Sequence, residues 1–495
     1  MTASHDVARR KLLSLSAAGL LSAGVMGRAE KVAAMQPAIA DALPGAVTGQ
    51  LKALAGRGTS SSLFLPPAYG GKDQPVAPTK ADQLTLDWHK ARFAALFDTV
   101  ADQGVQSVLL RNVNNTAYFT GIQVFASERP QGVLKNRDDA GPWVFHPTHY
   151  TEILKTSWVD GSKEYFDFPH AAGGFPNRGQ VVAGPSVDLF GFMLEGIRDK
   201  GVQGNKLGVD GELYPSELAK VQAILPNVEV INVSGAIRNL RIVKTPEELA
   251  LYSRSYLYND RAQAFARDYL LTYGTDVTDL ELESVTQLWL LDDLYNSIDL
   301  GGGQVNKGAG TRGTVKIRTG RNTGISAPNQ PYYQRFGPDQ SVQLTSVVKL
   351  DGCGGEAYRV LLTAGADGKF DPHAERLWTA SLRSCDIQRD LQKAGAQANL
   401  IAKAIYDDLV AQDLQRYVFH RPAHGLASEG HYAPFIALGD ETRLPLNSAL
   451  SQEPGLYDSE RGFGFNWSDT VVTGQDKGYR LSRVPYSREW NLLTL

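Results

Sequence analysis

The order of the expected helices and strands changes near residue 236, and this change constrains the fold more than any other feature. Between residues 86 and 236, helical patterns alternate with short apolar segments such as VQSVLLR and VEVINV, as they do in α/β domains. Beyond residue 237, a long helix is expected to begin after Thr245, with a cap, a proline and two acidic residues, and to run to about Tyr273. Strand-like segments that carry polar residues follow it. We therefore predict an α+β chain with two domains, 86–236 and 237–495.

The first 85 residues have the features of an export signal followed by a linker. Arg9-Arg10 precedes the weakly apolar run LLSLSAAGLLSAGV, which is too short to span a bilayer. Adjacent arginines before such a run are typical of twin-arginine signals. We predict a signal peptide over residues 1–34, a linker over 35–85, and a periplasmic or secreted protein.

The composition excludes several classes of function. The chain has 50 basic and 53 acidic side chains and a formal net charge of −3, so it has no overall field that would attract nucleic acid or an anionic membrane. No segment after the signal is a long enough apolar run to span a membrane, and we expect no membrane contact after signal cleavage. Only two cysteines are present, Cys353 and Cys385, which are too few for a cysteine-based zinc site. Whether they pair is left open by the sequence.

Four motifs follow one another along the chain: NTAYFTG from Asn115, His424-Gly425 followed by His431 and Pro434, EPGLY from Glu453, and DTVV from Asp469. In this order they resemble motifs of the creatinase, prolidase and aminopeptidase P superfamily, the M24 peptidases. The resemblance implies a pita-bread catalytic-type domain over 237–495, a creatinase-like N-terminal domain over 86–236, and a homodimer.

The resemblance also implies a set of metal ligands that this chain matches only in part. The peptidases of the superfamily hold two metal ions with Asp, a second Asp, His, Glu and a final Glu. Asp351, His424 and Glu453 match three of these positions, whereas the second Asp falls on a leucine (361 or 362) and the final Glu on Ser468. Two cations held close together need bridging negative charge. We therefore predict no dinuclear centre, and either no cofactor or one divalent metal ion on Asp351, His424 and Glu453.

The predicted catalytic residues are His424, His431, Glu453, Tyr332, Tyr333 and Arg359. His424 is the expected base, and His431 is the expected acid or oxyanion donor. Glu453 orients His424 or anchors the substrate. Tyr332 or Tyr333 stands where the resemblance implies a catalytic histidine, and Arg359 is expected to clamp an anion.

These residues favour an exported hydrolase or lyase that acts on a small carboxylate-bearing molecule by histidine and carboxylate acid–base chemistry. The resemblance implies hydrolysis, although the superfamily also includes a lyase of dimethylsulfoniopropionate. Two alternatives remain open: a metal-dependent Xaa-Pro dipeptidase or aminopeptidase, and a non-catalytic binding protein on a relict M24 fold. The partner in either enzymatic case is a small-molecule substrate.

Overall fold

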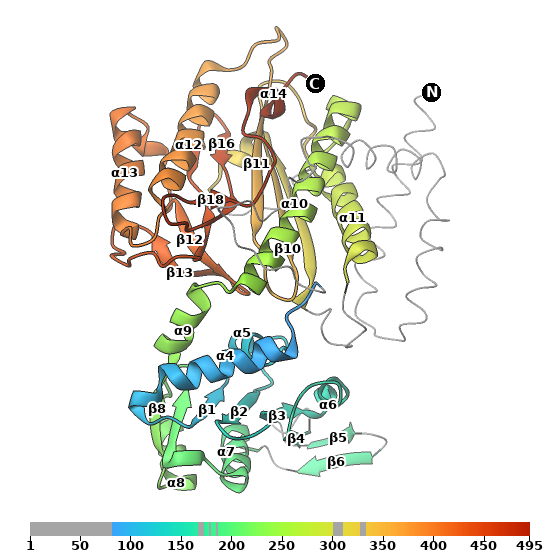
Figure 1. Ribbon diagram of the computed structural model, residues 1–495. Coiled ribbons are helices and arrows are strands. Elements are labelled where there is room, and N and C mark those ends of the chain that lie inside the picture. Colours follow the sequence, from blue (N-terminus) through green and yellow to red (C-terminus); the bar gives the residue numbers. More distant parts are fainter. Residues whose placement is uncertain (1–81, 167–172, 178–179, 185–186, 300–309, 327–332) are drawn as a thin grey trace.

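The computed structural model describes residues 82–166, 173–177, 180–184, 187–299, 310–326 and 333–495. These residues form two lobes, with the N-terminal domain below the C-terminal domain in Figure 1. The predicted signal peptide and almost all of the predicted linker lie outside the described residues. Within the described residues, no helix is both long and apolar enough to cross a membrane.

The N-terminal domain is built on a mixed six-stranded sheet with the order β4-β3-β2-β1-β7-β8. Its strands are β1 Ser107–Leu110, β2 Gly132–Asn136, β3 Trp143–Pro147, β4 Gly161–Tyr165, β7 Lys206–Val209 and β8 Glu229–Asn232. Its main helices are α4 Leu86–Thr99, α5 Val113–Thr120, α6 Thr151–Leu154, α7 Leu189–Lys200 and α8 Pro215–Ile224, and the hairpin β5 Gly173–Asn177 and β6 Gln180–Gly184 extends to one side (Figure 1). The alternation of helices and strands expected for this part of the chain is confirmed.

Helix α9 (Ser234–Ile242) connects the two domains, so the predicted boundary at residue 236 falls inside a helix. Arg241, near its end, is buried and donates to Asn115 of the N-terminal domain at 2.9 Å. The same guanidinium donates to Glu429 of the C-terminal domain at 3.0 Å. Because the buried guanidinium of Arg241 bonds to both domains, it fixes α9 in place between them.

Helix α10 (Pro246–Tyr273) confirms the long helix predicted from its start signals. The Thr245 hydroxyl accepts from the Glu248 amide at 3.2 Å, and the Glu248 carboxylate accepts from the Thr245 amide at 2.9 Å. This reciprocal capping box, with Pro246 in the first turn, satisfies amides that the helix cannot bond itself. The observed end at Tyr273 also agrees with the prediction.

The C-terminal domain contains two larger sheets with helices packed against them. The four-stranded sheet has the order β19-β11-β10-β9, and the five-stranded sheet has the order β13-β12-β14-β17-β18. Their strands are β9 Arg312–Thr319, β10 Ser341–Lys349, β11 Glu356–Thr363, β12 Ala423–Ala427, β13 Gly430–Ile436, β14 Ala449–Gln452, β17 Asp469–Val472, β18 Tyr479–Arg480 and β19 Leu492–Leu493. A smaller hairpin joins β15 Gly455–Asp458 to β16 Phe463–Asn466.

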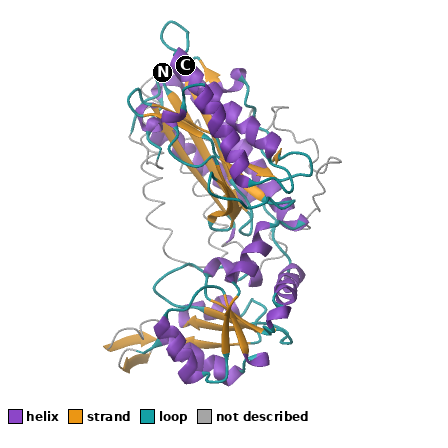
Figure 2. Ribbon diagram, turned by 90° about the vertical axis from the view of Figure 1, so that its left-hand side faces the viewer, coloured by secondary structure: helices purple, strands orange, loops and turns teal. Residues whose placement is uncertain are grey.

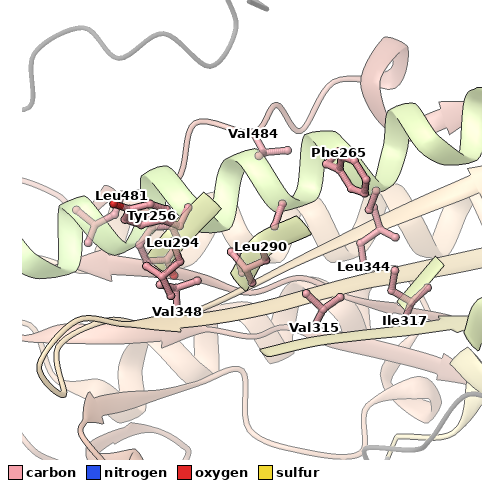
Figure 3. Packing of buried hydrophobic residues seen from close by; sticks show 14 of the residues in the cluster. Tyr256, Phe265, Leu290, Leu294, Val315, Ile317, Leu344, Val348, Leu481 and Val484 are labelled. Carbon is pink, nitrogen blue, oxygen red and sulfur yellow. The ribbon is translucent and has the colours of Figure 1, made fainter. Parts of the chain in front are cut away.

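Two helical layers bury the outer faces of these sheets. Phe265 of α10 and Leu290 of α11 (Asp279–Ser297) pack on Leu344 and Val315 of the four-stranded sheet (Figure 3). On the other side, α12 (Pro372–Leu391) and α13 (Ala398–Ala411) cover a second apolar cluster. Figure 2 shows the long strands of this lobe running between the helices. Apolar burial of this extent is the main force that holds the strands bearing the site in place.

The two cysteines are both free and buried. Cys353 belongs to the cluster beneath α10, and Cys385 belongs to the cluster beneath α12 and α13. Each thiol therefore serves as a small apolar core group.

Candidate active site

His424 lies at the centre of the candidate site, on β12, with 1% of its side chain exposed. Its Nδ1 is 2.9 Å from the Gly425 carbonyl. Because a carbonyl only accepts, Nδ1 carries the proton of this contact. Its Nε2 lies 3.0 Å from Glu453 and 3.5 Å from Glu356, within ion-pair distance of both carboxylates. Burial lowers the pKa of His424, but the interactions with Glu356 and Glu453 outweigh burial and raise it to about 10, so the imidazole is protonated near neutral pH.

Glu356, the first residue of β11, is the acidic residue that the sequence analysis missed. Its Oε1 accepts from the Ser451 hydroxyl at 2.9 Å, and its Oε2 accepts from the Tyr358 hydroxyl at 2.6 Å. Burial raises the pKa of Glu356, but the interactions with His424, Glu453 and the Tyr358 hydroxyl outweigh burial and lower it well below its usual range. Glu356 is therefore ionised near neutral pH.

Glu453 follows β14, and its pKa is shifted in the opposite direction from that of Glu356. Burial first, and then the negative charge of Glu356, raise the pKa of Glu453 well above that of an ordinary glutamate, although His424 lowers it. The two carboxylates share one histidine, and their charges repel each other in a buried site. Their pKa values therefore separate, with Glu356 as the ionised member and Glu453 as the protonated one.

His431, on β13, completes the predicted histidine pair. Its ring stacks on that of His424, with centroids 3.9 Å apart and planes inclined by 29°. Burial and the neighbouring positive charge of His424 lower the pKa of His431. The structure thus brings together His424, His431 and Glu453, as the sequence predicted, and keeps His431 neutral.

A third histidine borders this group. The Nε2 of His420 lies 2.9 Å from the Tyr457 hydroxyl, and burial lowers the pKa of His420. His420 is not among the residues predicted from the sequence. The signal for His420 is its position four residues before His424. The signal for Glu356 is its position at the start of the strand that follows Asp351.

Asp351 is placed elsewhere, contrary to the prediction that it could join His424 and Glu453 in holding a metal ion. Its carboxylate accepts from the Leu84 amide at 2.8 Å and from Gln123 at 3.4 Å. It lines a small cavity at the domain junction together with Lys244 and Glu248. The tight turn after β10 directs Asp351 toward the N-terminal domain, because its φ of 47° is left-handed.

Arg359 is also placed away from the site, and the prediction of an anion clamp is wrong. Its side chain is fully buried and donates to both carboxylate oxygens of Asp469 at 3.1 Å and to Ser482 at 2.6 Å. Residues alternate between the two faces of a strand, so β11 directs Glu356 and Arg359 to opposite sides. The guanidinium is committed to the core and cannot meet a substrate.

The remaining predicted positions supply no catalytic group in the described structure. Tyr332 lies outside the described residues, and Tyr333 is largely exposed. Leu361 and Leu362 are both fully buried in the core, and Glu356 is the residue of the same strand whose carboxylate lies beside His424. Ser468 bonds to Ser451 at 2.8 Å and contributes no charge.

The described residues fit one metal ion better than two. His424, His431 and Glu453 each offer a ligand atom, and these atoms lie within 4.8 Å of one another. Nε2 of His424 could ligate an ion after losing its proton, and Nδ1 is already fixed by a carbonyl as in many metal sites. With Asp351 turned away and a serine at position 468, the described carboxylates at this centre are Glu356 and Glu453, too few to bridge two ions.

Gly425 maintains the spacing between β12 and β13, the strands that carry His424 and His431. The register of β12 and β13 shifts between His424 and Gly425, and a Cβ at Gly425 would lie 2.2 Å from the Ala433 carbonyl oxygen. We expect Gly425→Ala to lower the free energy of unfolding by about 1–3 kcal/mol through overpacking, measured by chemical denaturation. Gly439→Ala is the control, because a Cβ there meets no atom within 4 Å, and an equal loss in both variants would contradict this explanation.

The fold and the site together define a creatinase-like N-terminal domain joined to a pita-bread domain with a histidine and glutamate centre. The model for the creatinase/prolidase N-terminal domain matches residues 92–243, and that for metallopeptidase family M24 matches residues 302–475. The chain belongs to the creatinase/prolidase (M24) superfamily, as its motifs predicted. No curated protein matches the sequence.

Solved structures with the same fold include three peptidases. The dipeptidase PepE of Mycobacterium ulcerans has 17% identity and a TM-score of 0.64, and covers 83% of this chain and 100% of its own. Recombinant prolidase of Thermococcus sibiricus has 18% identity and a TM-score of 0.63 with the same coverage. The X-Pro aminopeptidase of Thermotoga maritima MSB8 has 14% identity and a TM-score of 0.62, covering 82% and 99%. At these identities the likeness establishes the fold alone.

Proposed function

We propose that this protein is a hydrolase that cleaves a C–N bond in a small carboxylate-bearing molecule by acid–base chemistry. The observation that carries the proposal is the placement of the buried His424 between Glu356 and Glu453, with His431 stacked on it. Two carboxylates with opposite pKa shifts around one imidazole can serve as paired base and acid. Membership of the M24 superfamily favours hydrolysis over the lyase reaction.

The proposed role of each residue follows from its protonation state. Ionised Glu356 removes a proton from the attacking water, and the water oxygen bonds to the substrate carbonyl carbon. Protonated Glu453 donates its proton to the nitrogen as the C–N bond breaks. His424 stabilises the charge of the carboxylate pair, and His431 is available to hydrogen-bond to the carbonyl oxygen as negative charge develops there. We therefore assign the base to Glu356 in place of His424.

A metal ion is compatible with these residues, although the proposed proton transfers do not require one. If a divalent ion binds His424, His431 and Glu453, it would supply Lewis-acid polarisation of the substrate carbonyl. Such binding would require Glu453 and His424 to lose their protons, so the acid role proposed for Glu453 belongs to the metal-free protein. We propose that the protein holds at most one ion, because the described carboxylates do not support a bridged pair.

The proposal is tested by measuring metal content and hydrolysis on the same preparation. The protein is purified without added metal or a chelating tag, and is assayed with N-carbamoylglycine and glycylproline, with and without EDTA. We expect at most one equivalent of metal per chain and turnover of at least one compound. His424→Ala should abolish that turnover, whereas the exposed His149→Ala should retain it.

The other outcomes separate the alternatives. Two equivalents of metal, with EDTA-sensitive cleavage of glycylproline, would contradict the proposal in favour of a metal-dependent Xaa-Pro peptidase. An unsaturated product formed without water uptake would indicate a lyase. Binding of either compound without any turnover would favour the non-catalytic alternative.

A further inference from the structure

The side chain of Arg421 lies at the exposed edge of the histidine cluster. Its Nη2 is 3.3 Å from Nδ1 of His431, and its guanidinium lies over the ring of Phe435, 4.6 Å from the centroid. Stacking on an aromatic face holds an arginine in one orientation while leaving its N–H groups available. Among the residues that the structure describes, no carboxylate forms an ion pair with Arg421.

The backbone at Arg421 is braced as well. Nδ1 of His420 lies 2.8 Å from the Arg421 carbonyl, and the opposite ring nitrogen lies 2.9 Å from the Tyr457 hydroxyl. Tyr457 itself is buried. The chain from Tyr457 through His420 therefore fixes the backbone that carries Arg421 beside the site.

The other arginines near the centre are already engaged. Arg359 is paired with Asp469 in the core. Arg318, which is buried, donates to the Ile325 carbonyl at 3.2 Å and contacts Gln343. Among the residues that the structure describes, Arg421 is thus the arginine beside the site that combines a fixed position, solvent access and no acidic partner.

We propose that Arg421 binds the carboxylate of the substrate and sets the specificity of the enzyme for acids. This proposal rests on the proposed function, since it names the anchor for that substrate. A carboxylate bonded to the outer N–H groups of Arg421 would lie beside His431, whose ring stacks on that of His424. A planar guanidinium binds a carboxylate through paired charge-assisted hydrogen bonds.

The contact between Arg421 and His431 also defines the tautomer of His431. A guanidinium only donates, so Nδ1 of His431 accepts from Arg421 and Nε2 carries the ring proton. That N–H is then available to the carbonyl oxygen of a substrate anchored by Arg421. One arginine thus orients both the substrate and the oxyanion donor.

The test compares acids with their uncharged amides in three variants. N-carbamoylglycine and glycylproline, each with its carboxamide, are measured by calorimetric binding and by turnover. Arg421→Gln should weaken binding of the acids and raise their KM by about 10- to 100-fold, the effect of losing a charge-assisted hydrogen bond. It should leave the amides almost unchanged, and kcat should fall less than KM rises. Arg421→Lys should restore part of the loss, and Arg416→Gln should behave as wild type because Arg416 is exposed and contacts Tyr417.

The outcomes distinguish this proposal from the proposed function. Acid binding that depends on Arg421 without turnover supports the anchor and contradicts hydrolysis of these compounds. Turnover whose KM for acids is unchanged in Arg421→Gln overturns the anchor and leaves the hydrolase. Failure of the wild-type protein to prefer acids over amides also overturns the anchor.

Discussion

Replacing Arg359 with leucine is expected to lower the free energy of unfolding by about 3–5 kcal/mol, the cost of leaving one charge of a buried pair without its partner. Arg359 and Asp469 are both fully buried. Asp469 would keep only the Tyr486 hydroxyl and Arg480, whose Nε is 3.7 Å away. Arg359 also bonds to Ser482, so its loss would loosen the C-terminal segment.

Chemical denaturation followed by tryptophan fluorescence measures this loss, because Trp467 lies beside Tyr486 with centroids 4.7 Å apart. Arg383→Leu is the matched control, since Arg383 is exposed and its pair with Asp408 should contribute at most about 1 kcal/mol. If Arg359→Leu instead keeps full stability and loses only affinity for anions, the structural role assigned to Arg359 is incorrect.

Arg359 also explains why part of the site could not be predicted from sequence. An arginine near a candidate centre has the same sequence signature whether it faces a ligand or a buried carboxylate. Its partner Asp469 is 110 residues away, and only the pairing of β11 with its neighbours decides which face it occupies. The stacking of Arg421 on Phe435 likewise depends on how the loop before β12 packs beside β13.

The local features were predictable because their causes are local. The cap at Thr245, Pro246 in the first turn and the two acidic residues after it are adjacent in the chain, and they predicted the start of α10 correctly. The histidine pair was also found, because β12 and β13 form one hairpin whose spacing fixes the contact between the rings. Glu356 was missed because the expected spacing from Asp351 pointed to a leucine, whereas the turn after β10 is short and brings an earlier residue of β11 to the centre.

The second large effect, a loss of catalytic rate, is expected when either Glu356 or Glu453 is replaced. Glu356→Gln and Glu453→Gln keep the shape of each side chain but remove the base and the acid, respectively. Each should lower kcat by about 10²- to 10⁴-fold, the usual contribution of one acid–base group, on whichever compound the wild-type protein hydrolyses. The measurement is steady-state kinetics across pH, with unfolding curves to show that both variants remain folded.

The pH profiles separate the two roles. Wild-type kcat should fall as pH rises, because the acid form of Glu453 is lost when that group ionises, and its raised pKa places this loss above the range of an ordinary glutamate. Glu453→Gln should lack that alkaline decline, while Glu356→Gln should retain it at a lower rate. Glu441→Gln is the control, because Glu441 is an exposed glutamate of the same domain. An alkaline decline that persists in Glu453→Gln would assign the acid to another group, and His431, whose ring already stacks on His424, would be the next to replace.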